Sequence, residues 1–168
     1  MILAVALLIG GVYYYVFVYH LKKTLVRKML AGASWIMIGV ADDLFGRFQP
    51  EYGEENARLL AAAAVNELFS QPPSRPLTSE EQSFINSHKD IIERELANLS
   101  HNPEMVEVIT QAVRVNCFVA QDPASLIAAC ERLMRLGFPL GGEAPIPPTF
   151  LPLAREFYLK MKSRRPDL

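Results

Sequence analysis

Apolar and aromatic residues fill the chain from residue 1 to residue 19, and no charged side chain interrupts them. The run reads MILAVALLIGGVYYYVFVY. An α-helix rises about 1.5 Å per residue, so a helix of this length spans about 28 Å, close to the hydrocarbon thickness of a bilayer. The pattern predicts that residues 1–20 form a single transmembrane anchor.

Residues 21–49 carry a helical pattern of their own, which predicts a juxtamembrane amphipathic helix. Its apolar stripe, at spacings of three and four, consists of Leu25, Met29, Ala33, Ile36, Val40, Leu44 and Phe48. The uncharged part, residues 29–41, is too short to span a bilayer. Two arrangements stay open: one long helix that continues the anchor, or an interfacial helix in the membrane plane with Trp35 at headgroup depth.

Residues 50–168 are expected to form a helical soluble domain. Gln49-Pro50 should end the preceding helix, because a proline disfavours helical backbone at the residue before it. The expected helix starts are Glu54 and Glu55, the capping box of Thr78 and Glu81, the cap-proline pairs Asn102-Pro103 and Asp122-Pro123, and Thr149. The helix that Thr78 opens should end near Ser100, and Gly137 should terminate the helix that follows Asp122.

No segment alternates convincingly with the period of two that marks a half-buried strand. The chain of 168 residues is long enough for one ordinary domain beside the anchor. The predicted fold class is therefore all-α, with an N-terminal single transmembrane helix, a juxtamembrane helix and a small bundle of about five short helices.

A basic cluster follows the apolar run at once and sets the expected topology. Its members are Lys22, Lys23, Arg27 and Lys28. Basic residues beside a span stay on the cytoplasmic side, so we expect the N-terminus outside and the C-terminal domain in the cytoplasm. A cleaved signal peptide carries its basic residues before the apolar run, so this order favours a retained anchor. The aromatic residues expected at the membrane interface are Tyr13, Tyr14, Tyr15 and Tyr19.

The remaining charge is unevenly distributed. The formal net charge of the whole chain is only −1, which gives no global signal for nucleic acid. The segment 49–100 is acidic, and the tail from Lys160 to Arg165 is basic. Basic residues complement the dipole at a helix end, which explains the tail, and contact with anionic lipid is the alternative.

Small residues in two places would let a neighbouring helix approach closely. Gly10 and Gly11 leave a flat spot on the anchor, and the run from Ala61 to Ala64 leaves little bulk on the helix after Pro50. We therefore expect these glycines and alanines to be helix-packing positions.

No group of residues matches a catalytic, cofactor or metal motif. His88 lies on an apolar helix face, and the residues one turn further on are isoleucines, which cannot bind a metal. Asp42 and Asp43 are adjacent, so on a helix they point about 100° apart. The two cysteines, Cys117 and Cys130, form no disulfide framework or metal box and are expected to stay unbridged. The sequence therefore predicts no catalytic residue, no cofactor and no metal site.

These features favour a membrane-anchored, non-enzymatic subunit or scaffold of a membrane-associated complex. Its expected partners are the lipid bilayer and other subunits of that complex, with no nucleic acid. One alternative is a small membrane-bound enzyme or cofactor binder, whose site is assembled from scattered residues such as His88, Asp42 and Glu67. The other is a periplasmic adaptor of reversed topology.

Overall fold

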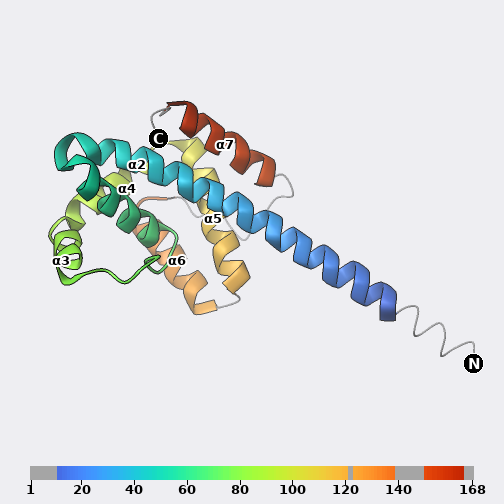
Figure 1. Ribbon diagram of the computed structural model, residues 1–168. Coiled ribbons are helices and arrows are strands. Elements are labelled where there is room, and N and C mark those ends of the chain that lie inside the picture. The colour runs from blue at the N-terminus through green and yellow to red at the C-terminus, as the bar shows by residue number, and fades with distance from the viewer. Residues whose placement is uncertain (1–10, 121–122, 139–149, 165–168) are drawn as a thin grey trace, which may run out of the picture.

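The chain consists of a helical domain from which one end of a long helix projects, as a computed structural model shows (Figure 1). The structure describes residues 11–120, 123–138 and 150–164. The described residues contain a π-helical segment and six α-helices but no strand, which confirms the all-α prediction for them. The elements are η1 Tyr14–Tyr19, α2 His20–Leu68, α3 Ser79–Ser87, α4 Lys89–Leu99, α5 Pro103–Ala120, α6 Pro123–Arg135 and α7 Phe150–Arg164.

Helix α2 is divided at Gly53 into a first limb, residues 20–52, and a second limb, residues 54–68. The prediction that Gln49-Pro50 ends the first limb is wrong by one turn, because Pro50 lies inside the helix. The backbone leaves helical geometry at Gly53, with φ 74° and ψ 174°, a combination essentially restricted to glycine. A Cβ added to Gly53 would meet nothing within 4 Å, so the backbone angles and not the space require a glycine here. Glu54 and Glu55 open the second limb, as predicted.

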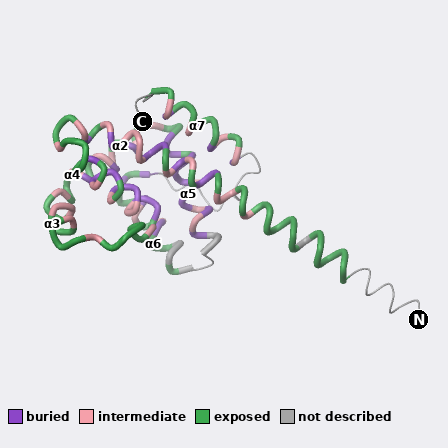
Figure 2. Tube along the Cα trace, in the orientation of Figure 1, coloured by how far each residue is buried: buried purple, intermediate pink, exposed green. Residues whose placement is uncertain are grey.

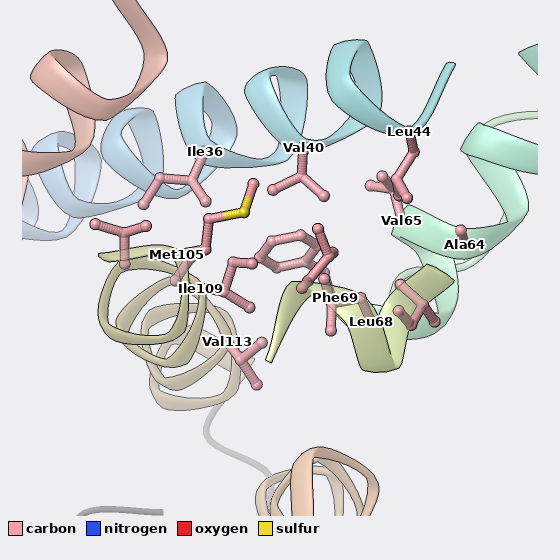
Figure 3. Close-up of a cluster of buried hydrophobic side chains, with 14 of the residues drawn as sticks. Ile36, Val40, Leu44, Ala64, Val65, Leu68, Phe69, Met105, Ile109 and Val113 are labelled. Carbon is pink, nitrogen blue, oxygen red and sulfur yellow. The ribbon is translucent and has the colours of Figure 1, made fainter. Parts of the chain in front are cut away.

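The first limb of α2 supplies one wall of the hydrophobic core. Ile36, Val40 and Leu44 are fully buried; Ile36 and Val40 point toward Met105 and Ile109 of α5, and Leu44 points toward Val65 (Figure 3). The second limb and the turn after it complete this wall with Val65, Leu68 and Phe69. The predicted stripe is thus buried from Ala33 onward, whereas Leu25 is exposed and Met29 is half-buried. Residues 33–48 of the expected juxtamembrane helix share a core with the expected domain of residues 50–168.

The stretch from Thr78 to Ser100 forms two helices instead of the single predicted helix. The capping box is confirmed, since Glu81 N–H donates to Thr78 Oγ1 and Thr78 N–H donates to the Glu81 carboxylate. The helix stops at His88, where φ is −113° and ψ is 17°. Ser87 Oγ and His88 Nδ1 both donate to Phe84 O, each at 2.8 Å. These side chains occupy the carbonyl that a continuing helix would offer to the His88 N–H.

Helix α5 begins as its sequence predicts. Asn102 Oδ1 accepts hydrogen bonds from the N–H groups of Glu104 and Met105, and Pro103 is the first helical residue. Gly137 follows α6 with φ 86°, the left-handed conformation expected of a residue that ends a helix. The predicted caps Asp122 and Thr149 lie outside the described residues.

Helix α7 lies parallel to the first limb of α2 and contacts it more extensively than any other element does. Two glycines of α2 make room for it. A Cβ at Gly32 would lie 3.1 Å from the ring of Phe150, and a Cβ at Gly39 would lie 3.5 Å from Met161. The two glycines are seven residues apart and therefore share one face of α2. Farther along, Lys162 Nζ pairs with Asp42 at 3.2 Å.

Helix α6 is tied to the C-terminal end of α2 by one arginine. Arg132 donates to the backbone oxygen of Glu67 and, at 2.7 Å, to Ser70 Oγ. Ser70 has a positive φ of 54°, which places it just past the helix end. A cation at the last carbonyls of a helix complements the helix dipole, so Arg132 stabilises this terminus.

Candidate functional site

The most distinctive surface of the molecule is the projecting part of the long helix. Every side chain that the structure describes between Gly11 and Leu25 is exposed, although most are apolar or aromatic (Figure 2). Tyr14 and Leu21 each expose 70% of their surface, and Phe17 exposes 56%. The helix Gly11–Leu68 is long and apolar enough to cross a membrane, judged by length and composition.

Aromatic side chains of the projecting helix stack on one another along its length. The rings of Tyr13 and Phe17 are 4.7 Å apart, and those of Tyr15 and Tyr19 are 5.4 Å apart. Both pairs are four residues apart and therefore lie one turn from each other. A Cβ on Gly11 would meet nothing within 4 Å, so this predicted packing position is open in the isolated chain. Gly10, its predicted neighbour, lies outside the described residues.

The basic cluster forms a collar around the helix at the base of this apolar part. Lys22, Lys23, Arg27 and Lys28 are all exposed. At about 100° per residue their side chains point in different directions and cover most of the helix circumference. They span about 9 Å along the axis, comparable to the ~5–8 Å depth of the headgroup region on one side of a bilayer. Basic side chains thus surround the helix between its apolar part and the domain.

The collar is joined to the domain by helix without a break. Of the two arrangements that the sequence left open, the structure therefore has the continuous helix. Gly32, where α7 begins to cover α2, lies about 20 Å along the axis from Tyr19. Trp35 lies still farther along and is half-buried at the domain. Lys162, near the basic end of α7, lies level with Asp42, about 35 Å from Tyr19 along the axis.

The alanines predicted for contact with other helices are used within the domain itself. Ala64 is fully buried, and Ala61 is 3% exposed. The second limb of α2, which carries them, belongs to the same core as α4 and α5. Ala61 and Ala64 therefore let the domain's own helices pack closely, whereas Ala62 of the same run is exposed.

The polar residues considered for chemistry are not brought together. His88 contacts the rings of Tyr52 and Phe84, at 5.2 and 4.2 Å. Asp42 pairs with Lys162 of α7, whereas Glu67 lies at the other end of α2, where α6 is attached. In the part of the chain that the structure describes, no three His, Cys, Asp or Glu side chains are placed to hold a metal ion. Cys117 is buried, Cys130 is half-buried, and no disulfide joins them.

An ion pair fixes the linker between α2 and α3. The Arg75 guanidinium donates two hydrogen bonds to the Glu81 carboxylate and one to Pro76 O. The hydrogen bond from Arg75, assisted by the Thr78 N–H, lowers the pKa of Glu81 from 4.5 to about 2. Glu81 thus acts twice, as the capping-box partner of Thr78 and as the anchor of the linker.

Several of these residues were not identified from the sequence. Gly32 and Gly39 seat α7, and their spacing of seven is visible in the sequence, but nothing local says which helix they receive. Arg75 and Arg132 make contacts that depend on chain reversal, so periodicity carries no signal for them. Comparisons with protein families, with curated proteins and with solved structures found no match to this chain.

Proposed function

We propose that the chain is a single-pass membrane protein whose projecting helix is the anchor and whose helical domain serves as a scaffold in a membrane-associated complex. The observation that carries the proposal is the projecting helix itself, apolar on all sides and bare along its described length. A large exposed apolar surface marks a membrane or protein contact. The uncharged run of residues 1–19 is long enough, as a helix, to span a bilayer, and this length and the encircling basic collar favour the membrane.

The collar also supports an orientation. The four basic residues at the domain side of the anchor favour a cytoplasmic domain, because positive charge is retained on that side. Anionic lipids of the cytoplasmic leaflet attract such residues, each by about 1 kcal/mol. The proposed topology therefore has the N-terminus outside, and the domain stands in the cytoplasm on a helical stem.

The continuity of the helix supports a scaffold role. Because the first limb of α2 runs unbroken from the collar into the core, bilayer and domain are joined by one rigid element. A domain held at a fixed height and direction is suited to positioning partner proteins beside a membrane. The domain would act through protein contacts and without chemistry of its own.

Topology and extraction assays test the anchor. We expect the full chain to stay in the membrane fraction at alkaline pH. We also expect a reporter enzyme active only outside the cytoplasm to be silent when fused after Leu168. Replacing Lys22, Lys23, Arg27 and Lys28 with glutamate should weaken the orientation, whereas exchanging lysine and arginine at these positions, which keeps the charge, should not.

Two results would contradict this proposal. Release of the chain by alkaline extraction would show that the projecting helix binds a protein and not the bilayer. An active reporter after Leu168 would reverse the topology and favour the periplasmic adaptor.

A further inference from the structure

A groove of about 650 Å³ lies between the second limb of α2 and the linker that leads to α3. Apolar side chains from both sides contribute to it, namely Leu59, Ala62, Leu77 and Phe84. Ala62 is exposed, and the other three are half-buried. The groove therefore offers accessible apolar surface at a place where two segments of the chain face each other.

The walls of the groove are held in place before any partner binds. The bonds of Arg75 and Thr78 to Glu81 fix the linker to the first turn of α3. The opposite wall is the second limb of α2, whose inner face is part of the core. A preformed site loses less conformational freedom on binding, so its contacts translate more fully into affinity.

Five charged side chains line the groove, the carboxylates of Glu55, Glu80 and Glu81 and the guanidinium groups of Arg58 and Arg75. Each of the four basic side chains in the segment 49–100 already pairs with a carboxylate: Arg58 with Glu54, Arg75 with Glu81, Lys89 with Glu93 and Arg94 with Glu95. Glu55 and Glu80 line the groove, are exposed, and have no basic partner among the described residues. Two carboxylates are thus available to a ligand beside the apolar surface.

We propose that this groove binds a basic amphipathic segment of a partner protein, with apolar side chains on Leu59 and Leu77 and lysine or arginine at Glu55 and Glu80. Charge complementarity selects this occupant: both arginines of the lining are already paired, so the unpaired charge of the groove is negative and disfavours the phosphates of lipid headgroups and nucleic acid. The position of the groove is compatible with a partner protein, because α3 lies at the end of the molecule opposite the projecting helix (Figure 1). The inference deepens the proposed scaffold role and rests on it.

Binding of a defined peptide tests the proposal. The probe is a fluorescent 14-residue helix of leucine and lysine, with leucines on one face, offered to the full chain in phosphatidylcholine nanodiscs. We expect saturable binding that weakens with added salt. The double substitution Glu55→Gln with Glu80→Gln should weaken it about tenfold, because it removes two exposed charge pairs. Ala62→Arg, which adds bulk and positive charge inside the groove, should weaken it similarly.

Matched variants separate the groove from general acidity. Glu51→Gln with Asp90→Asn removes two carboxylates that do not line the groove, and Ala128→Arg adds an arginine to an exposed site on α6. Both should bind the peptide as the parent chain does. The proposal is overturned if the parent chain does not bind, if a peptide with glutamate in place of lysine binds equally, or if the groove variants bind normally.

Failure of the groove and failure of the anchor are distinguishable. The peptide assay is repeated on the full chain in a neutral detergent, where binding does not depend on bilayer insertion. A chain that enters nanodiscs but does not bind the peptide overturns the groove proposal alone. A chain that binds the peptide in detergent but is released from membranes at alkaline pH overturns the anchor alone.

Discussion

Asn102 illustrates how one side chain fixes the start of a helix. Its Oδ1 lies 3.1 Å from Glu104 N and 3.4 Å from Met105 N, and it satisfies N–H groups that no carbonyl of α5 reaches. Asn102→Ala should therefore lower the free energy of unfolding by about 1 kcal/mol. Urea unfolding of the full chain in detergent, followed by circular dichroism, measures this change.

Asn98 provides a control for that experiment. It is exposed and donates only to Glu95, at 3.3 Å, so Asn98→Ala should change the unfolding free energy by less than about 0.5 kcal/mol. Asn102→Asp should retain the cap. Equal effects of the two alanine substitutions would show that Asn102 does not act as a cap.

Glu81 gives the stability of the linker a defined pH dependence. Its pKa of about 2 in the folded chain is below its usual value of 4.5, so its ionised form stabilises the fold. That contribution is complete above pH 4.5 and is lost as the pH falls from 4.5 toward 2. Glutamine keeps the capping geometry but not the charge. The difference between the urea midpoints of the parent chain and Glu81→Gln should therefore shrink on acidification from pH 5 to pH 3.

The neighbouring carboxylate serves as the control for this titration. Glu80 makes no hydrogen bond or ion pair among the described residues, so Glu80→Gln should leave this pH dependence in place. A constant difference between Glu81→Gln and the parent chain across the range would contradict the role assigned to the Arg75–Glu81 pair.

At the scale of elements, the seating of α7 on α2 depends on two positions without side chains. A Cβ at Gly39 would lie 3.5 Å from Met161, an ordinary contact distance. Gly39→Ala should therefore raise the unfolding free energy by about 0.5–1 kcal/mol, because alanine is the better helix former. Gly39→Leu should lower it by about 1–3 kcal/mol, because its side chain would overlap Met161 and Phe157. Thermal unfolding measures both changes.

Gly32 provides a second position at which to test the packing of α7 on α2. Its added Cβ would lie 3.1 Å from the Phe150 ring, which must shift to accept it. Gly32→Ala should consequently stabilise the chain less than Gly39→Ala does. If Gly39→Leu unfolds at the same temperature as the parent chain, α7 does not pack at this glycine.

At the scale of the whole molecule, the domain cannot be separated from the first limb of α2. Ile36, Val40, Leu44 and Phe48 are buried to 2% exposure or less. Burial of such side chains contributes about 1.5–3 kcal/mol each, so together they approach the whole stability of an ordinary domain. A fragment of residues 21–168 should unfold cooperatively, whereas a fragment of residues 50–168 should not. Urea titration followed by circular dichroism distinguishes them, and a cooperative transition in the shorter fragment would contradict this account.

The features that the sequence determined by itself are local. The apolar run, the basic collar, the capping box of Thr78 and the cap at Asn102 each act within a few residues, where periodicity and hydrogen-bonding rules apply directly. The all-α class follows from the same periodicity. Two wrong predictions also have local causes. The predicted helix from Thr78 to Ser100 is divided because the side chains of Ser87 and His88 compete for a carbonyl. The first limb of α2 ends at Gly53, three residues after Pro50, because the glycine adopts the non-helical backbone angles.

Tertiary structure alone decided which surfaces meet. The apolar stripe from Ala33 to Phe48 was visible in the sequence. Such a stripe can pack against a lipid interface or against a protein core. Only the position of α5 shows that this stripe packs in the core. Gly32 and Gly39 are separated from their α7 partners by more than a hundred residues. The acidic excess of the segment 49–100 was likewise visible in the sequence. Only the folded structure shows which of its carboxylates pair with a basic side chain and which do not. Contacts between distant segments depend on the packing of the whole chain, which no local rule specifies.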